Sequence, residues 1–102
     1  MQNTSKQHFI EKFETAGPEE FYLILFRYAQ ARISENTINK GPSPEVELLN
    51  YSNQFMQIYR RENKESYKLI SYAFRRAAHK AYRMMVKQKL IKRSNKFLNL
   101  VE

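Results

Sequence analysis

The feature that most constrains the fold is a long stretch, residues 66–93, that contains no proline, no glycine and no acidic residue. When its residues are placed at 100° intervals, as in an α-helix, the side chains separate onto two opposite faces. One face is apolar and consists of Tyr67, Ile70, Phe74, Ala77, Ala78, Ala81 and Met85. The other is a basic stripe that consists of Arg76, Lys80, Arg83 and Lys87. This pattern predicts a helix that packs one face into a core and turns the basic stripe outward.

Proline, glycine and asparagine mark where the helices begin and end. Gly17-Pro18 separates a short amphipathic segment from a longer apolar one, and Ser43-Pro44 begins a third. Asn63 lies in a polar segment and can end that third helix. We predict an all-α fold, a small four-helix bundle that forms a single domain over residues 1–102. Its helices are expected at about residues 5–15, 18–33, 44–62 and 64–92, followed by a short C-terminal helical turn that carries Phe97, Leu98, Leu100 and Val101.

The segment 18–33 is apolar on most of its surface for two turns, from Phe21 to Phe26. We therefore expect it to be the central and most buried helix, with a partner-binding surface as the alternative use of those side chains. Residues 34–43 are rich in Asn, Gly, Pro and Ser and show no periodicity, so they are expected to be a simple crossover loop, with a functional loop as the alternative.

A second arrangement of the C-terminal half is also compatible with the sequence. No glycine or proline follows Pro44, and the apolar faces before and after Asn63 differ by only about 40° on one helical wheel. The last two helices can therefore be continuous to about Gln88, with a long apolar seam that a second copy covers in a dimer. We prefer a break near Asn63, because four folded helices bury more apolar surface per chain. A monomer and a homodimer both remain open.

Several function classes find no support in the residues. The chain has no Cys and no Asp, and His8 and His79 lie far apart. Disulfides, thiolate metal sites and a Ser-His-Asp triad are thereby excluded, so we expect no metal, no cofactor and no enzymatic activity. The longest apolar run is far shorter than the ~20 residues of a membrane span, and no targeting segment is visible. We expect a cytoplasmic protein.

The charge of the chain is unevenly distributed. Residues 1–59 carry five Lys or Arg and seven Glu, a net charge of −2. Residues 60–102 carry thirteen Lys or Arg and three Glu, a net charge of +10. Such asymmetry between the two halves of a chain suggests that the basic half meets an anionic partner.

The basic stripe is the candidate contact surface for that partner. Its four cations extend over about 16 Å of helix, enough to contact several successive phosphates. Tyr72 and Tyr82 border the stripe and can stack on unpaired bases. We therefore predict binding to nucleic acid, or to an acidic protein surface. The candidate anion-binding residues are Arg60, Arg61, Lys64, Lys68, Arg75, Arg76, Lys80, Arg83 and Lys87.

A second function class follows from architecture alone. A small, basic bundle of four helices is similar to the bacteriocin immunity proteins, which are cytosolic helical bundles that act at a membrane receptor. The similarity involves no defined residues. It implies a regulatory or protein-interaction module with no role in nucleic-acid binding.

Overall fold

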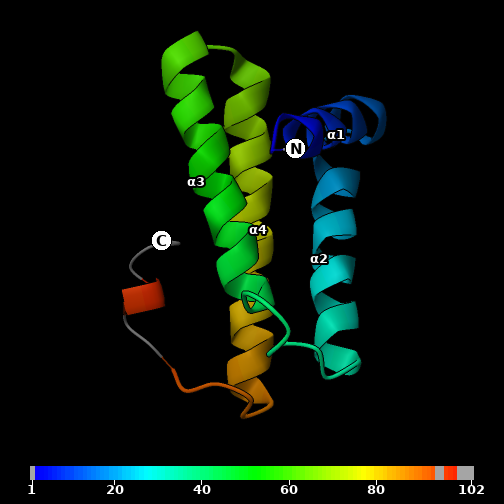
Figure 1. Cartoon of the computed structure of the whole chain (residues 1–102), viewed down its shortest axis with the longest axis vertical. Coiled ribbons are helices and arrows are strands. Elements are labelled where there is room, and N and C mark those ends of the chain that lie inside the picture. The colour runs from blue at the N-terminus through cyan, green and yellow to red at the C-terminus, as the bar shows by residue number, and fades with distance from the viewer. Residues whose placement is uncertain (1, 94–95, 99–102) are drawn as a thin grey trace.

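The computed structural model describes residues 2–93 and 96–98, and its first 93 residues form four helices (Figure 1). These are α1 (Gln2–Ala16), α2 (Pro18–Ser34), α3 (Pro44–Glu62) and α4 (Glu65–Lys87). The helices α3 and α4 lie antiparallel along one another, α2 lies beside α4, and α1 crosses the end of α2. The all-α bundle predicted from the sequence is confirmed.

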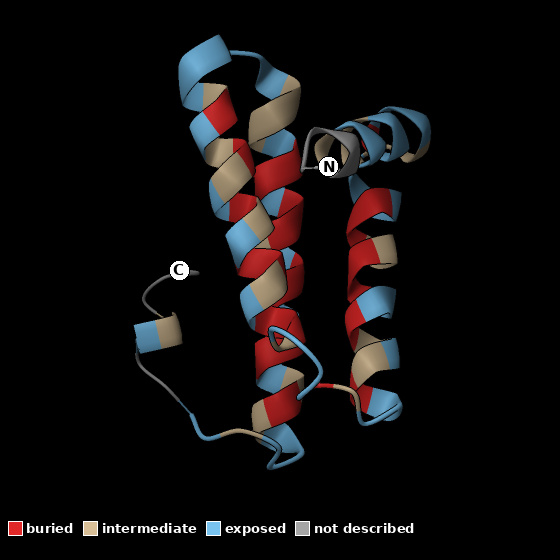
Figure 2. Cartoon of the chain, in the orientation of Figure 1, coloured by how far each residue is buried: buried red, intermediate tan, exposed pale blue. Residues whose placement is uncertain are grey.

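The central helix is α4, and the prediction that residues 18–33 hold this position is wrong. Helix α4 packs against both α3 and α2, whereas α2 and α3 have few direct contacts with each other. The reason is the alanine content of α4: Ala73, Ala77, Ala78 and Ala81 are all buried, and small side chains let two neighbouring helices approach closely. Figure 2 shows the buried residues on the surfaces where α2, α3 and α4 face one another.

The aromatic residues of all four helices meet in one core. The ring of Phe74 lies between those of Phe21, at 5.6 Å, and Phe55, at 5.8 Å between centroids. Phe13 packs edge-on against Phe21, at 5.6 Å. Phe21, Tyr22, Leu25 and Phe26 are buried within this fold and contribute to its core.

The break between α3 and α4 occurs at Asn63, as the sequence predicted. Asn63 adopts the left-handed conformation, with φ of 55°, and its N–H donates to the carbonyl of Tyr59 at 2.7 Å. Asparagine tolerates this conformation better than most residues, which makes it a suitable helix end. The alternative of one continuous helix is therefore wrong, because the chain reverses direction here (Figure 1).

Helix α4 ends at Lys87, five residues before its predicted end at 92. Lys89 has a φ of 60°, its N–H donates to the carbonyl of Val86, and the N–H of Leu90 donates to that of Met85. This pair of hydrogen bonds is a Schellman motif. The helix ends where its two-faced pattern is lost, because continuation would turn Lys89 and Lys92 toward the apolar side.

The predicted C-terminal turn is present at residues 96–98, whereas Leu100 and Val101 lie outside the described residues. The ring of Phe97 stacks on that of Tyr82 at 4.6 Å between centroids. This contact places the short C-terminal turn against α4.

Two serines form a closed hydrogen-bonded pair inside the α3–α4 interface. The hydroxyl of Ser52 donates to the backbone carbonyl of Ser71 at 2.8 Å, and the hydroxyl of Ser71 donates to that of Ser52 at 2.7 Å. Both side chains are fully buried. Each hydroxyl therefore has a partner, which removes most of the cost of placing it in an apolar interface.

The α2–α3 loop is more organised than a simple crossover. The guanidinium of Arg32, whose side chain is only 12% exposed, donates to the backbone carbonyls of Thr37, Lys40 and Pro42 at 2.7–2.9 Å. Its Nη1 also lies 3.4 Å from the carboxylate of Glu47. A single side chain thus fastens three loop carbonyls to the end of α2 and to the start of α3.

Glu47 also accepts a short hydrogen bond from the hydroxyl of Tyr28. Burial raises the pKa of Tyr28 above its ordinary value of about 10, and the acceptor and charge of Glu47 raise it further. A tyrosine whose pKa is raised on folding stabilises the folded state at pH values below its ordinary pKa. This stabilisation is lost as the pH rises through the pKa of the folded state.

We predict that Glu47→Gln lowers the pKa of Tyr28 toward its ordinary value, because the substitution removes the neighbouring negative charge. NMR titration of the labelled tyrosine rings measures this pKa. An unchanged or higher pKa of Tyr28 in the variant would contradict the assigned cause.

Candidate nucleic-acid interface

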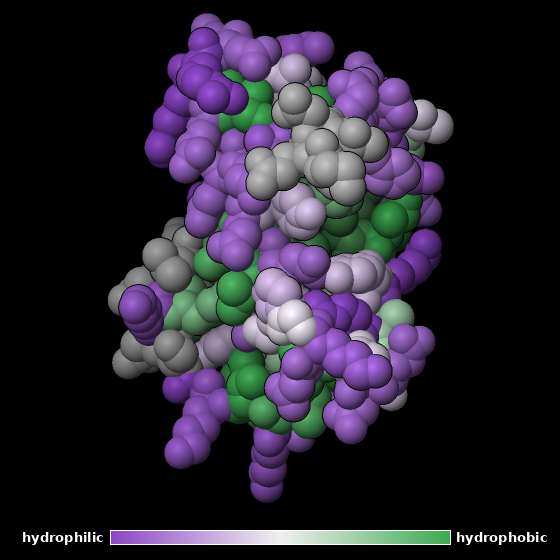
Figure 3. Space-filling view, viewed as in Figure 1, coloured by the Kyte–Doolittle hydropathy of each residue, from purple (hydrophilic) through white to green (hydrophobic). Residues whose placement is uncertain are grey.

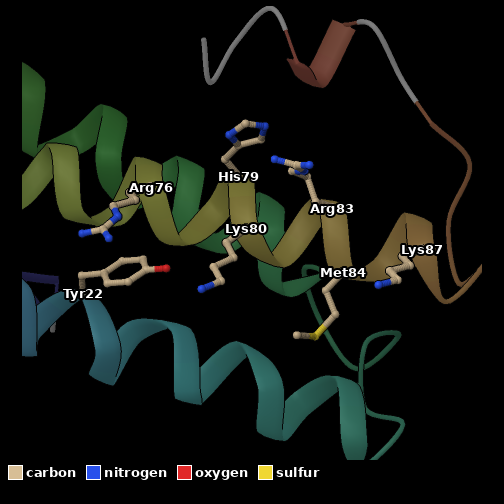
Figure 4. Close-up of a pocket in the computed structure, with 7 residues that line it drawn as sticks. All are labelled: Tyr22, Arg76, His79, Lys80, Arg83, Met84 and Lys87. Carbon is tan, nitrogen blue, oxygen red and sulfur yellow. The ribbon is translucent and has the colours of Figure 1, made fainter.

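The basic stripe lies on the outer surface of α4, and all four of its members are exposed. Their side chains nevertheless diverge (Figure 4). Arg76 and Lys80 point toward α2, whereas Arg83 points away from α2, toward the C-terminal segment, as does the neighbouring His79. The stripe therefore has two parts with different surroundings.

The first part is held by α2. Arg76 forms an ion pair with Glu19 at 2.9 Å, and its guanidinium lies 3.8 Å from the centroid of the Tyr22 ring. The hydrogen bond that the guanidinium donates to the carboxylate of Glu19 raises the pKa of Arg76. The Nζ of Lys80 lies 4.8 Å from the centroid of the Phe26 ring. These cations thus cover aromatic faces of α2, and Arg76 already has an anionic partner within the chain.

The second part of the stripe, which consists of Arg83 and Lys87, lies between two hollows in the surface. The larger, of about 590 Å³, is an open groove between α2 and α4. It is lined by Tyr22, Arg76, His79, Lys80, Arg83, Met84 and Lys87 (Figure 4). The smaller, of about 310 Å³, lies between α4 and the C-terminal segment, and Arg93 and Leu98 are among its lining residues. Both hollows share His79, Arg83 and Lys87, which we call the basic ridge.

Among the described residues, Arg83 and Lys87 of the basic ridge and the nearby Arg93 have no acidic partner. Within residues 6–93 and 96–98, no carboxylate lies within ion-pair distance of Arg83, Lys87 or Arg93. Their charges are therefore not neutralised by this part of the chain, and they concentrate positive potential around the two hollows.

The other five predicted residues do not join the ridge. Lys68 forms an ion pair with Glu65 at 3.6 Å, which raises its pKa, and Lys64 lies over the ring of Tyr67. Arg60 and Arg61 are exposed in the last turn of α3, next to the α3–α4 turn. This turn lies at the opposite end of the helical hairpin from Lys87. Arg75 is half-buried, and its Nε has no hydrogen-bond partner among the described residues. The nine candidates therefore do not form one continuous surface.

The two predicted aromatic neighbours differ in accessibility. Tyr72 is 47% exposed and lies one turn before Arg76 on the same side of α4. Tyr82 is buried against Phe97 and cannot stack on a base without displacing that ring.

Sequence analysis missed several contributors to this surface, among them Tyr22, Met84 and Arg93. Tyr22 lies within an apolar run, and no local signal distinguishes the one ring that reaches the groove. Arg93 follows the point where the helical pattern fails, so its return toward α4 could be found only from the chain reversal at Lys89.

The described residues hold no group of three or more His or Glu side chains arranged to bind a metal ion. Nor is any helix in this part of the chain long and apolar enough to cross a bilayer. Comparison with protein families, curated proteins and solved structures finds no significant match. Function is therefore inferred from the side chains of this chain alone.

Proposed function

We propose that the protein is a non-enzymatic nucleic-acid-binding protein that contacts the phosphate backbone through the outer face of α4. The observation that carries the proposal is the convergence of Arg83, Lys87 and Arg93, without acidic partners among the described residues, around two adjacent hollows. Arginine can contact phosphate oxygens with two donors at once, and lysine adds a point charge.

The exposed ring of Tyr72 favours single-stranded over duplex nucleic acid. A base in a single strand can leave its neighbours and stack on an aromatic side chain, which contributes about 1–3 kcal/mol per base. Tyr72 lies one turn before Arg76 on α4, outside the groove itself, so a strand that extends past the groove along α4 reaches both the ring and the cations. Contacts to the phosphate backbone carry no sequence information, so the expected binding depends little on sequence.

Salt titration tests the proposal directly. The logarithm of the affinity for a fluorescent single-stranded oligonucleotide should fall linearly with the logarithm of the salt concentration, with a slope of about −0.7 for each phosphate contacted. Three or four contacts predict a slope of about −2 to −3. A slope near zero, or no binding at low salt, would refute a nucleic-acid role. A partner retained after nuclease treatment would instead support a protein-interaction module.

We predict that Glu19→Gln strengthens oligonucleotide binding about fivefold at low salt, because Arg76 loses its partner within the chain and can contact phosphate. Fluorescence anisotropy measures the affinity. The matched control is Glu20→Gln, which changes the net charge equally but releases Arg27, a residue that lines neither hollow. Equal gains from the two variants would show that only net charge matters.

A further inference from the structure

A third hollow, of about 260 Å³, lies on a different face of the molecule, where α1, α2 and α3 meet above α4. Its lining is largely apolar and aromatic, and it shares no residue with the two hollows beside the basic ridge. It is lined by Phe9, Ile24, Leu25, Tyr28, Glu47, Leu48, Tyr51 and Phe74. Figure 3 shows hydrophobic side chains recessed between α2 and α3, below α1. The nucleic-acid proposal gives this hollow no role.

One end of the hollow is built from three rings. The centroid of Phe9 lies 4.9 Å from that of Tyr51 and 5.1 Å from that of Phe74, with the ring planes steeply inclined in both pairs. Tyr51 and Phe74 are 5.4 Å apart. These rings present both edges and faces in a small space, which is the environment that a further aromatic ring prefers.

The other end offers a hydrogen-bond acceptor. Both the hydroxyl of Tyr28 and the guanidinium of Arg32 donate to the Oε1 atom of Glu47. Among the described residues, no donor reaches the second carboxylate oxygen, Oε2. An acceptor with free lone pairs thus stands at the edge of an apolar hollow. A ligand in the hollow can form a hydrogen bond with Oε2 of Glu47 only if it carries an N–H or O–H group.

The charges around the hollow select a neutral ligand. Arg32 compensates the charge of Glu47 at 3.4 Å, and the whole chain carries a net charge of +8, so a cation gains little here. An anion also gains little, because the guanidinium donors of Arg32 already bind three loop carbonyls and Glu47. The volume lies just below the range of about 300–1,000 Å³ typical of drug-sized ligands, so it suits a molecule of one or two rings.

We infer that this hollow binds a small neutral aromatic molecule that places its ring against the half-buried Phe9 and Tyr51, with the buried Phe74 behind them, and donates one hydrogen bond to Glu47. Indole and simple phenols belong to this chemical class. Such a site is independent of the basic ridge, and the ligand can bind whether or not the protein binds nucleic acid.

Titration of the full chain with indole, followed by methyl NMR, tests this inference. The methyl signals of Ile24, Leu25 and Leu48 should shift saturably, and nuclear Overhauser contacts should link them to the indole protons. Benzofuran is the matched probe, because it has the same bicyclic shape with an oxygen in place of the N–H. It should bind about tenfold more weakly, since a hydrogen bond to a charged acceptor contributes at least this factor.

Two tryptophan substitutions separate specific from general binding. Ile24→Trp places a ring in the hollow and should abolish the indole-induced shifts, whereas Leu69→Trp adds the same ring at an exposed position on α4, outside the hollow, and should leave them unchanged. Shifts that persist in Ile24→Trp, equal affinity for indole and benzofuran, or no saturable shift would each overturn the inference. If Ile24→Trp fails to fold, the nuclear Overhauser contacts in the original protein decide the matter.

Discussion

Reversing Arg83 and Lys87 together to glutamate is expected to weaken single-stranded oligonucleotide binding by about 100-fold at low salt. Each lost phosphate contact removes nearly a factor of ten at about 50 mM salt through counterion release, and the new carboxylates add repulsion. The slope of log affinity against log salt should become shallower by about 1.4, which is the contribution of two phosphates. Fluorescence anisotropy over a range of salt concentrations measures both quantities.

The control for this experiment reverses Lys12 and Lys40, which are exposed residues in the acidic half of the chain. That variant has the same net charge as Arg83→Glu/Lys87→Glu but leaves the basic ridge intact. It should lose much less affinity, and far-UV circular dichroism should show that both variants keep their helices. If the two variants weaken binding equally, the contact surface is not on α4 and the proposed interface is wrong.

Replacement of Arg32 with methionine is expected to lower the free energy of unfolding by about 2–4 kcal/mol. Methionine keeps the apolar part of the side chain but leaves the carbonyls of Thr37, Lys40 and Pro42 without the donors that fix them. For a chain of about 100 residues this corresponds to a fall in Tm of roughly 10–20 °C. Thermal and urea unfolding followed by circular dichroism provide the measurement.

Arg27→Met, on the same helix, is the matched control. Arg27 is exposed, and its only ion pair among the described residues is with the exposed Glu20 at 3.9 Å, so the change should cost less than about 0.5 kcal/mol. Similar losses from the two variants would show that Arg32 does not organise the loop. The amides of Thr37 and Lys40, which donate hydrogen bonds within the loop, should exchange faster in Arg32→Met.

The fold was largely predictable because its signals are local. Pro18 and Pro44 each begin a helix, Asn63 ends one, and the apolar face of residues 67–85 lies in the core as its periodicity indicated. The position of α4 at the centre was not predictable in the same way. It depends on which helix two others can approach closely, and this is a property of the assembled structure.

The candidate site was predictable only in part, because a helical wheel gives the direction of a side chain but not its partners. The wheel places Arg76 and Arg83 on one stripe, yet the first is paired with Glu19, 57 positions earlier in the chain, and the second is unpaired among the described residues. Arg32 was missed for the same reason. Its acceptors are backbone carbonyls, which every residue has and which no sequence pattern marks.

The paired hydroxyls of Ser52 and Ser71 have a consequence for how the hairpin is aligned. An apolar interface between two helices tolerates a slide of one turn, about 5.4 Å, because one aliphatic contact replaces another. Here such a slide would strand two fully buried hydroxyls away from their acceptors, at a cost of about 1–3 kcal/mol for each. The two serines therefore favour a single register between α3 and α4.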